Sequence, residues 1–325
     1  MTNPGQSKIR DLFGKLTIKE PYRKTRWLSL RFRAYVDLLR PFTLLPPLII
    51  SMFIIVASII YYNKPLPDNW LITVVHASGT IAIVNAASNT LNQATDVAAD
   101  KISKPHRPIP LGIVKVDEAQ SLAYILYLFA LLRSATINPW FGFFIFMIMV
   151  FTVTYSLPPR MKQYLFINQV WIAIPRGMLG ILASWSVFGD NPLDATPLII
   201  GSIATVFLIG GMATKDISDA EADRRTGTRT LINTYGRRKA ALMCFPFMFF
   251  PFIFIAMFLD NGLDPYLWPL IFVVILTFPV IYLMIRSKES QTLENVPAWS
   301  IMYVQYMIFA MGFALLTIFS NELPL

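Results

Sequence analysis

Residues 70–100 read WLITVVHASGTIAIVNAASNTLNQATDVAAD, and much of the architecture can be argued from this one stretch. Its first part is apolar over about the 20 residues that a helix needs to cross roughly 30 Å of hydrocarbon. Its last part carries asparagine and aspartate at helical spacing, so polar side chains gather where the helix leaves the membrane. The stretch therefore predicts a membrane-spanning helix that ends in an acidic motif.

Apolar stretches of similar length recur along the whole chain. Its 325 residues are 55% hydrophobic and the mean hydropathy is +0.54, which is too apolar for an ordinary soluble domain. We therefore predict an all-α integral membrane protein with nine transmembrane helices. The predicted spans are Pro41–Tyr62, Trp70–Ala94, Ala119–Ile137, Trp140–Tyr155, Asn168–Phe188, Pro197–Ala213, Ala240–Leu259, Tyr266–Ile285 and Ala298–Phe319.

Basic residues are divided unequally between the two sides that nine spans define. The N-terminal segment and the loops on its side hold 25 of the 28 Lys and Arg residues. The other side holds Lys64 and Arg133, and its loops are acidic. Because Lys and Arg near span ends favour the cytoplasm, we predict a cytoplasmic N-terminus. Both acidic motifs then lie at the cytoplasmic face.

This topology divides the chain into two parts. Residues 1–40 form a basic segment, predicted to be cytoplasmic or interfacial, and residues 41–325 form the nine-helix transmembrane domain. The first segment has no uninterrupted apolar core, so we expect it to be retained rather than cleaved as a signal peptide. The net charge is +9, and the basic residues lie next to membrane spans. Membrane lipids rather than nucleic acid are therefore the predicted partner. The oligomeric state is left open.

Two acidic motifs carry the chemistry. Each spaces its members three or four residues apart, which places them on one helix face where like charges repel and a counter-ion is expected. Carboxylate and amide oxygens without adjacent His or Cys suit a hard cation, Mg²⁺ in particular. The predicted metal ligands are Asn92, Asp96 and Asp100 in the first motif and Asp216, Asp219 and Asp223 in the second.

Nearby basic and amide side chains complete the predicted site. Lys104, Arg107 and Lys215 are expected to bind the phosphate oxygens that the metal leaves uncovered, so that the two motifs clamp a diphosphate. Lys215 is also explained as a positive-inside anchor. Asn89 lies within the second span, where a lipid-facing polar group costs about 2.5–3.5 kcal/mol, so it should face the bundle interior.

These motifs resemble those of the UbiA superfamily of membrane prenyltransferases. Residues 92–100 match its Asn-x-x-x-Asp-x-x-x-Asp motif, and residues 219–223 match its Asp-x-x-x-Asp motif, with Asp216 as an earlier member. Residues 107–110, Arg-Pro-Ile-Pro, and residues 227–231 resemble the segments that follow the two motifs. The resemblance covers essentially the whole chain. Departures are Gln93 where many members have Asp, Leu111 where Ser is usual, and a Pro at the Lys position of Tyr-x-x-x-Lys.

The resemblance implies nine helices around a central cavity and a Mg²⁺-dependent enzyme. Such an enzyme transfers an isoprenyl chain from an allylic prenyl diphosphate to a lipophilic acceptor through an allylic carbocation. The aromatic ring of a quinone precursor is the favoured acceptor; a tetrapyrrole and a glycerol-phosphate lipid are alternatives. Arg160 and Lys162 follow Tyr155 and are the expected substitutes for the family lysine in diphosphate binding.

Two further residues are assigned to the cavity. Tyr155 is expected to contact substrate, although a Tyr at a span end also suits the interfacial aromatic belt. Arg176 lies well inside the fifth span, where an unpaired cation is costly, and is expected to orient the acceptor or to bind a structural partner. The alternative function is a membrane transporter of an anionic metabolite, which explains paired aspartates poorly because carboxylates repel anions.

Overall fold

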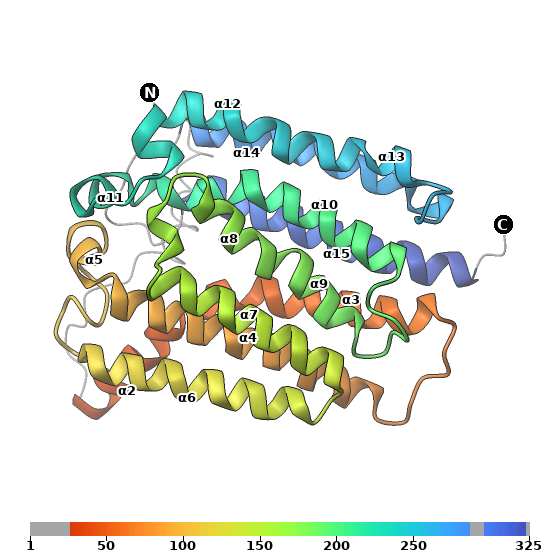
Figure 1. Ribbon diagram of the computed structural model, residues 1–325, viewed down its shortest axis with the longest axis horizontal. Helices are drawn as coiled ribbons and strands as arrows, with labels where there is room; N and C mark the ends of the chain where they lie inside the picture. The colour runs from red at the N-terminus through yellow and green to blue at the C-terminus, as the bar shows by residue number, and fades with distance from the viewer. Residues whose placement is uncertain (1–26, 287–295, 323–325) are drawn as a thin grey trace, which may run out of the picture.

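The structure is a computed structural model that describes residues 27–286 and 296–322. In this part of the chain all regular elements are helices and there is no strand, which confirms the all-α prediction. Predictions for residues 1–26 of the basic segment lie outside the described residues. Most helices run side by side along the long axis, with α5 and α11 at one end of the bundle and α13 at the other (Figure 1).

The helices follow the apolar runs closely. The first half of the chain forms α2 (Trp27–Leu39), η1 (Pro41–Leu44), α3 (Leu45–Tyr61), α4 (Trp70–Thr95), α5 (Val97–Ser103), α6 (Val116–Ala135), α7 (Pro139–Ser156) and η2 (Met161–Gln163). The second half forms α8 (Ile167–Arg176), α9 (Met178–Trp185), α10 (Ala195–Gly211), η3 (Met212–Ile217), α11 (Ala220–Thr226), α12 (Leu231–Ile253), α13 (Ile255–Phe258), η4 (Pro265–Leu276), α14 (Thr277–Arg286) and α15 (Pro297–Glu322).

Seven helical segments in the described part are long and apolar enough to cross a membrane. Two of the nine predicted spans do not qualify. The third forms α6, whose first turn carries Asp117 and Glu118 and whose last turn carries Arg133. The fifth forms two helices, α8 and α9, of 10 and 8 residues, and neither alone is as long as a membrane span. The coarser prediction, an apolar helical membrane bundle, is confirmed.

The break between α8 and α9 was not predicted, and it has a clear cause. Pro175 cannot donate a backbone hydrogen bond within α8, and Gly177 then leaves helical geometry with φ −90° and ψ −94°. The Oγ1 atom of Thr205 on α10 accepts a hydrogen bond from the Met178 amide at 2.7 Å. A side chain at position 177 would meet the Thr205 backbone at 2.7 Å. The break therefore lets α8 and α9 approach α10 closely.

Apolar side chains on both sides of this break hold the bundle together. α4 packs on α6 and α3, α15 packs on α3, and α10 packs on α12. The largest fully buried side chains include Trp185, Phe207 and Phe252. The end of the bundle that carries α5 and α11 also carries the two acidic motifs and is called the motif end. Here Ala34 and Leu38 of α2 are buried against Ile109 and Val114, while Leu28 and Phe32 on the other face of α2 are more than 70% exposed. This exposed apolar face agrees with an interfacial role for α2, which stays a prediction.

Candidate active site

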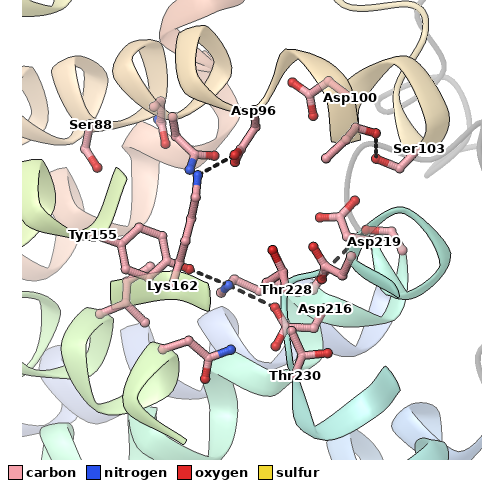
Figure 2. A pocket seen from close by; sticks show the side chains of 18 of the residues that line it. Ser88, Asp96, Asp100, Ser103, Tyr155, Lys162, Asp216, Asp219, Thr228 and Thr230 are labelled. Atoms are coloured by element: carbon pink, nitrogen blue, oxygen red, sulfur yellow. Dashed lines mark hydrogen bonds and ion pairs between the residues drawn. The ribbon is translucent and has the colours of Figure 1, made fainter. Parts of the chain in front are cut away.

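A cavity lies at the motif end of the bundle and extends inward between α4, α7 and α8. All of the predicted site residues line it except Arg160. Figure 2 shows Asp96 and Asp100 on one side of this cavity and Asp216 and Asp219 on the other. Two motifs that are more than a hundred residues apart in sequence therefore share one site.

The first motif is not a continuous helical stripe, contrary to the prediction. α4 ends at Thr95, and Asp96 occupies the junction with φ −106° and ψ 21° before α5 begins at Val97. Arg160 and Lys162, from the loop after α7, both bind the Asp96 carboxylate. Both contacts therefore form at the residue where the helix is interrupted. Asp100 lies one turn further on and is 4% exposed.

The second motif also leaves regular α-helix. Asp216 is in the 3₁₀ helix η3, Asp219 is the N-cap residue of α11, and Asp223 lies one turn into α11. Gly227 ends α11 in the left-handed region with φ 78°, a conformation that favours glycine. This geometry turns α11 across the end of the bundle, where it packs against α5. The two motif helices thus face each other outside the apolar core.

Basic side chains are the counter-ions of the acidic cluster in this structure. Lys162 Nζ lies 2.5 Å from Asp96 Oδ1, and Arg160 Nη2 lies 2.9 Å from the same oxygen. The other pairs are Arg107 with Asp100 at 2.7 Å, Lys215 with Asp216 at 2.9 Å, and Lys104 with Asp219. The predicted diphosphate-binding cations are therefore adjacent to the predicted metal ligands, and each pairs with one of them.

Burial and charge shift the pKa values of these groups in different directions. Burial raises the pKa of Asp100, although Arg107 and Lys104 oppose it. Burial also acts on Asp219, but Lys104 and Arg107 outweigh it and lower the pKa. Asp223 forms no ion pair with the residues that the structure describes, and burial together with Asp216 and Asp219 raises its pKa to about 8. Burial lowers the pKa of Lys162 in spite of Asp96.

The donor set fits a hard divalent cation. Asp216 lines the cavity, and its buried Oδ2 atom has no hydrogen-bond partner among the described residues, so one carboxylate oxygen of the site lacks a ligand of its own. Every predicted ligand offers oxygen, as Mg²⁺ prefers. Within residues 27–286 and 296–322, no three His, Cys, Asp or Glu side chains are grouped closely enough to hold a metal by themselves. Bound phosphate oxygens would have to complete such a site.

Arg160 differs from the other predicted diphosphate contacts. Its side chain is 41% exposed and does not line the cavity. Lys162, two residues later, is 7% exposed and does line it. Of the two candidates to replace the family lysine, Lys162 therefore has the better position.

The deeper part of the cavity is polar at a few points only. Asn89 donates to Thr43 Oγ1 at 2.8 Å and to the Leu39 carbonyl at 3.1 Å, so it joins α4 to the chain segment before α3. Tyr155 accepts a hydrogen bond from Lys215 at 2.8 Å. This contact links the wall formed by α7 to the second motif (Figure 2).

Arg176 lies where this cavity meets a second, more apolar one. Its guanidinium donates to the Tyr303 hydroxyl and reaches Asn85 Oδ1 at 3.5 Å. Both partners are neutral. The second cavity is lined by Pro47, Ile50, Ser51, Ile81, Val84, Asn85, Ile148, Thr152, Pro175, Arg176, Gly180, Ser184, Tyr303 and Tyr306. Arg176 has no carboxylate partner within residues 27–286 and 296–322, so its cation is available to an anionic group at this depth.

Sequence reasoning missed several residues that line the main cavity. They are neutral and lie inside apolar runs or loops: Ser88, Thr152, Asn168, Trp171, Thr228, Thr230 and Trp299. One signal could have found part of this set. Asn168, Trp171, Ile172, Pro175 and Arg176 recur at the spacing of one helix face, and Arg176 had already been assigned to the cavity.

Two relatives of the chain have the same name. The digeranylgeranylglyceryl phosphate synthase of Methanobrevibacter smithii is 23% identical over 296 residues, which cover 86% of this chain and 97% of that protein. The protein of the same name from Methanoregula boonei is 30% identical over 192 residues, which cover 58% of this chain and 63% of that protein.

Solved structures show the same fold. A UbiA homolog from Archaeoglobus fulgidus, bound to GPP and Mg²⁺, superposes with a TM-score of 0.66 at 20% identity and covers 89% of this chain and all of that chain. The model of the UbiA prenyltransferase family matches residues 51–307, which include both acidic motifs and most of the residues that line the cavity. The chain therefore belongs to the UbiA prenyltransferase family and is a prenyltransferase.

Proposed function

We propose that this protein transfers an isoprenyl chain from an allylic prenyl diphosphate to a lipophilic acceptor that carries an anionic head group. The observation that supports it best is a pair of adjoining cavities that differ in chemistry. The cavity at the motif end gathers carboxylates, lysines and arginines, and the second cavity combines apolar side chains with Arg176. A diphosphate suits the first cavity, and a prenyl tail with an acceptor suits the second.

The donor diphosphate would bind between the two motifs. The residues that would hold Mg²⁺ are Asn92, Asp96, Asp100, Asp216, Asp219 and Asp223. Bound Mg²⁺ supplies positive charge that stabilises the departing diphosphate. Lys104, Arg107, Lys162 and Lys215 would exchange their carboxylate partners for phosphate oxygens, and Arg160 would hold the Asp96 loop in place.

Bond cleavage at the allylic carbon leaves both electrons on the diphosphate and an allylic cation in the cavity. Water must be kept from this cation, and the walls around Ile50, Ile148 and Pro175 exclude it. The acceptor then attacks the cation, forms the new bond and loses a proton.

A glycerol-phosphate lipid is the acceptor that we propose first. The curated relatives named above are digeranylgeranylglyceryl phosphate synthases, and Arg176 offers an anion site within the bundle. The acceptor favoured by sequence, a quinone-precursor ring, also suits this site if it carries a carboxylate. Transport of an anionic metabolite is not proposed, because the chain belongs to a family of transferases.

The membrane topology is also proposed. We infer nine crossings, counting α6 and the broken pair α8 and α9, with a cytoplasmic N-terminus and the active site on that side. In Figure 1, α2 lies at the motif end of the bundle and α15 ends at the opposite end, as an odd number of crossings requires. Basic loops at the motif end support the orientation.

The function is tested by incubating the purified full-length protein with Mg²⁺ and radiolabelled prenyl diphosphates of several lengths. Each donor is paired with a prenylglyceryl phosphate, a hydroxybenzoate and a neutral prenyl alcohol. We expect a prenylated product with the glycerol phosphate and none with the alcohol. Product with the alcohol alone would contradict the anionic acceptor, and no product with any pair would contradict prenyl transfer.

A further inference from the structure

Asn168 is a buried amide on the cavity wall with no assigned role. It is the second residue of α8, and its side chain is part of the face that also presents Trp171, Ile172 and Arg176 to the cavity. The residue is only 1% exposed. Its place at the start of α8 puts it towards the motif end, because α8 packs against η2 and η3, which carry Lys162 and Lys215.

The Asn168 side chain has no hydrogen-bond partner among the described residues. Its Oδ1 atom is buried without a hydrogen-bond partner, its Nδ2 atom forms no hydrogen bond within the described part of the chain, and the residue lines the cavity. Buried amides in folded proteins nearly always form hydrogen bonds, since leaving them unpaired destabilises the fold. An unpaired amide in a substrate cavity is therefore explained most simply by a hydrogen bond that forms when the substrate binds.

The chemistry of the surroundings indicates which substrate atom that is. Lys104, Arg107, Lys162 and Lys215 are each paired with a carboxylate, so each must leave an ion pair before it binds a phosphate oxygen. The amide of Asn168 has no partner to leave. The N-terminal end of α8 adds partial positive charge, which favours an anion there.

We propose that Asn168 Nδ2 donates a hydrogen bond to a phosphate oxygen of the donor and so positions the leaving group. The inference rests on the proposed function, because it requires a diphosphate in this cavity. It adds a neutral donor on α8 to the two acidic motifs and their basic neighbours.

The adjacent residue supplies a matched control. Gln169 is also 1% exposed, and its Nε2 atom is buried without a partner, but it does not line the cavity. Gln169→Leu therefore removes an unpaired buried amide from the same helix turn without touching the site. Asn168→Leu does the same inside the cavity, and Asn168→Asp keeps the shape of the side chain but replaces its donor with an anion.

The test measures binding of inorganic diphosphate with Mg²⁺ to full-length protein by calorimetry, together with thermal stability and the KM for the prenyl diphosphate. We expect Asn168→Leu to weaken diphosphate binding about tenfold, which is the effect of one lost hydrogen bond to a charged group, without lowering the melting temperature. Asn168→Asp should weaken it further, and Gln169→Leu should bind as the wild type does.

Three outcomes would overturn the inference. Diphosphate binding within twofold of wild type in Asn168→Leu would show that the amide does not contact the diphosphate. Binding that is kept or tightened in Asn168→Asp would show that position 168 accepts rather than donates. If the wild-type protein bound neither diphosphate nor a prenyl diphosphate, this result would contradict the proposed function itself and therefore also the inference.

Discussion

Lys104, which follows α5, forms an ion pair with Asp219, the N-cap residue of α11, and this pair joins the segment after the first acidic motif to the second motif. The lysine side chain is 4% exposed and that of the aspartate 31%. The contact therefore fixes the distance between the two sides of the site before any ligand binds.

Lys104→Met should separate the two motifs. A carboxylate that loses its buried cationic partner destabilises the fold by about 1–3 kcal/mol, and the partial exposure of Asp219 favours the lower part of this range. We expect a lower thermal midpoint without ligand, partial recovery with Mg²⁺ and diphosphate, and kcat/KM reduced at least tenfold. Lys101→Met on exposed α5 surface is the control, and an equal loss there would contradict a specific role of the pair.

Asp96→Ala and Asp219→Ala should each abolish product formation and Mg²⁺-dependent diphosphate binding. Both carboxylates line the cavity, and each belongs to a different motif. Glu221 offers a control from the same segment, because its carboxylate pairs with Arg224 and Arg225 on the outer face and does not line the cavity. Glu221→Ala should keep nearly full activity. Full activity in both aspartate variants would refute the metal clamp.

Affinity for Mg²⁺ should rise with pH up to about 8. Burial and the neighbouring Asp216 and Asp219 raise the pKa of Asp223 to about 8, so this carboxyl is protonated at pH 7 in the metal-free protein. A metal must displace that proton, and affinity should increase up to tenfold per pH unit below the pKa and level off above it. Calorimetric titration of wild type and Asp223→Asn at pH 6 to 9 checks this. An equally steep pH dependence in Asp223→Asn would assign the proton elsewhere.

Hydropathy placed the helices well because membrane spans leave a strong signal in apolar run length. The prediction from hydropathy was less accurate where the backbone departs from a regular helix. At Asp96, where α4 stops, the side chain binds Lys162 and Arg160, which are more than sixty residues away, and no local sequence pattern contains that contact. The same holds for the junction at Gly177, where the partner that accepts from the freed amide is Thr205 on another helix.

Most charged residues of the cavity were predicted, with Arg40 as an exception, whereas among the neutral residues Asn89, Asn92 and Tyr155 were predicted and most others were not. Aspartates at helical spacing are rare beside membrane spans, so they are informative as residue types. Asn168 and Trp299 are ordinary residues near helix ends, and only the folded chain shows that both line the cavity. The pairing of lysines with aspartates was also not predicted, because the oxygen ligands favoured a metal as the counter-ion of the acidic motifs.

Gly177→Ala should disturb the junction that positions Arg176. An added Cβ would lie 2.7 Å from the Thr205 backbone, which cannot move aside as a flexible side chain would. Such overpacking costs about 1–3 kcal/mol, so the thermal midpoint and the activity should both fall. Gly142 in α7 is the control, since its nearest neighbour is the Ser134 hydroxyl at 3.8 Å. Gly142→Ala should be neutral or slightly stabilising, and a neutral Gly177→Ala would contradict a close packing role.

Arg176→Leu should distinguish the acceptor from the donor. The guanidinium contacts Tyr303 and Asn85, both neutral, and lies beyond the ion pairs of the motif end. If it binds the anionic head of the acceptor, its loss should raise the KM for the acceptor at least tenfold and change the KM for the prenyl diphosphate less than threefold, because a hydrogen bond to a charged group contributes about 1.5–3 kcal/mol.

Tyr303→Phe supplies the comparison that separates binding from structure. It removes one partner of Arg176 but keeps the cation in the cavity, so the KM for the acceptor should change only a few-fold. Arg176→Lys should recover part of the lost affinity, since the charge is kept while the fork of donors is not. Steady-state kinetics with each substrate varied in turn checks the series. A larger rise in the donor KM than in the acceptor KM for Arg176→Leu would place the arginine at the diphosphate and leave the acceptor site elsewhere in the bundle.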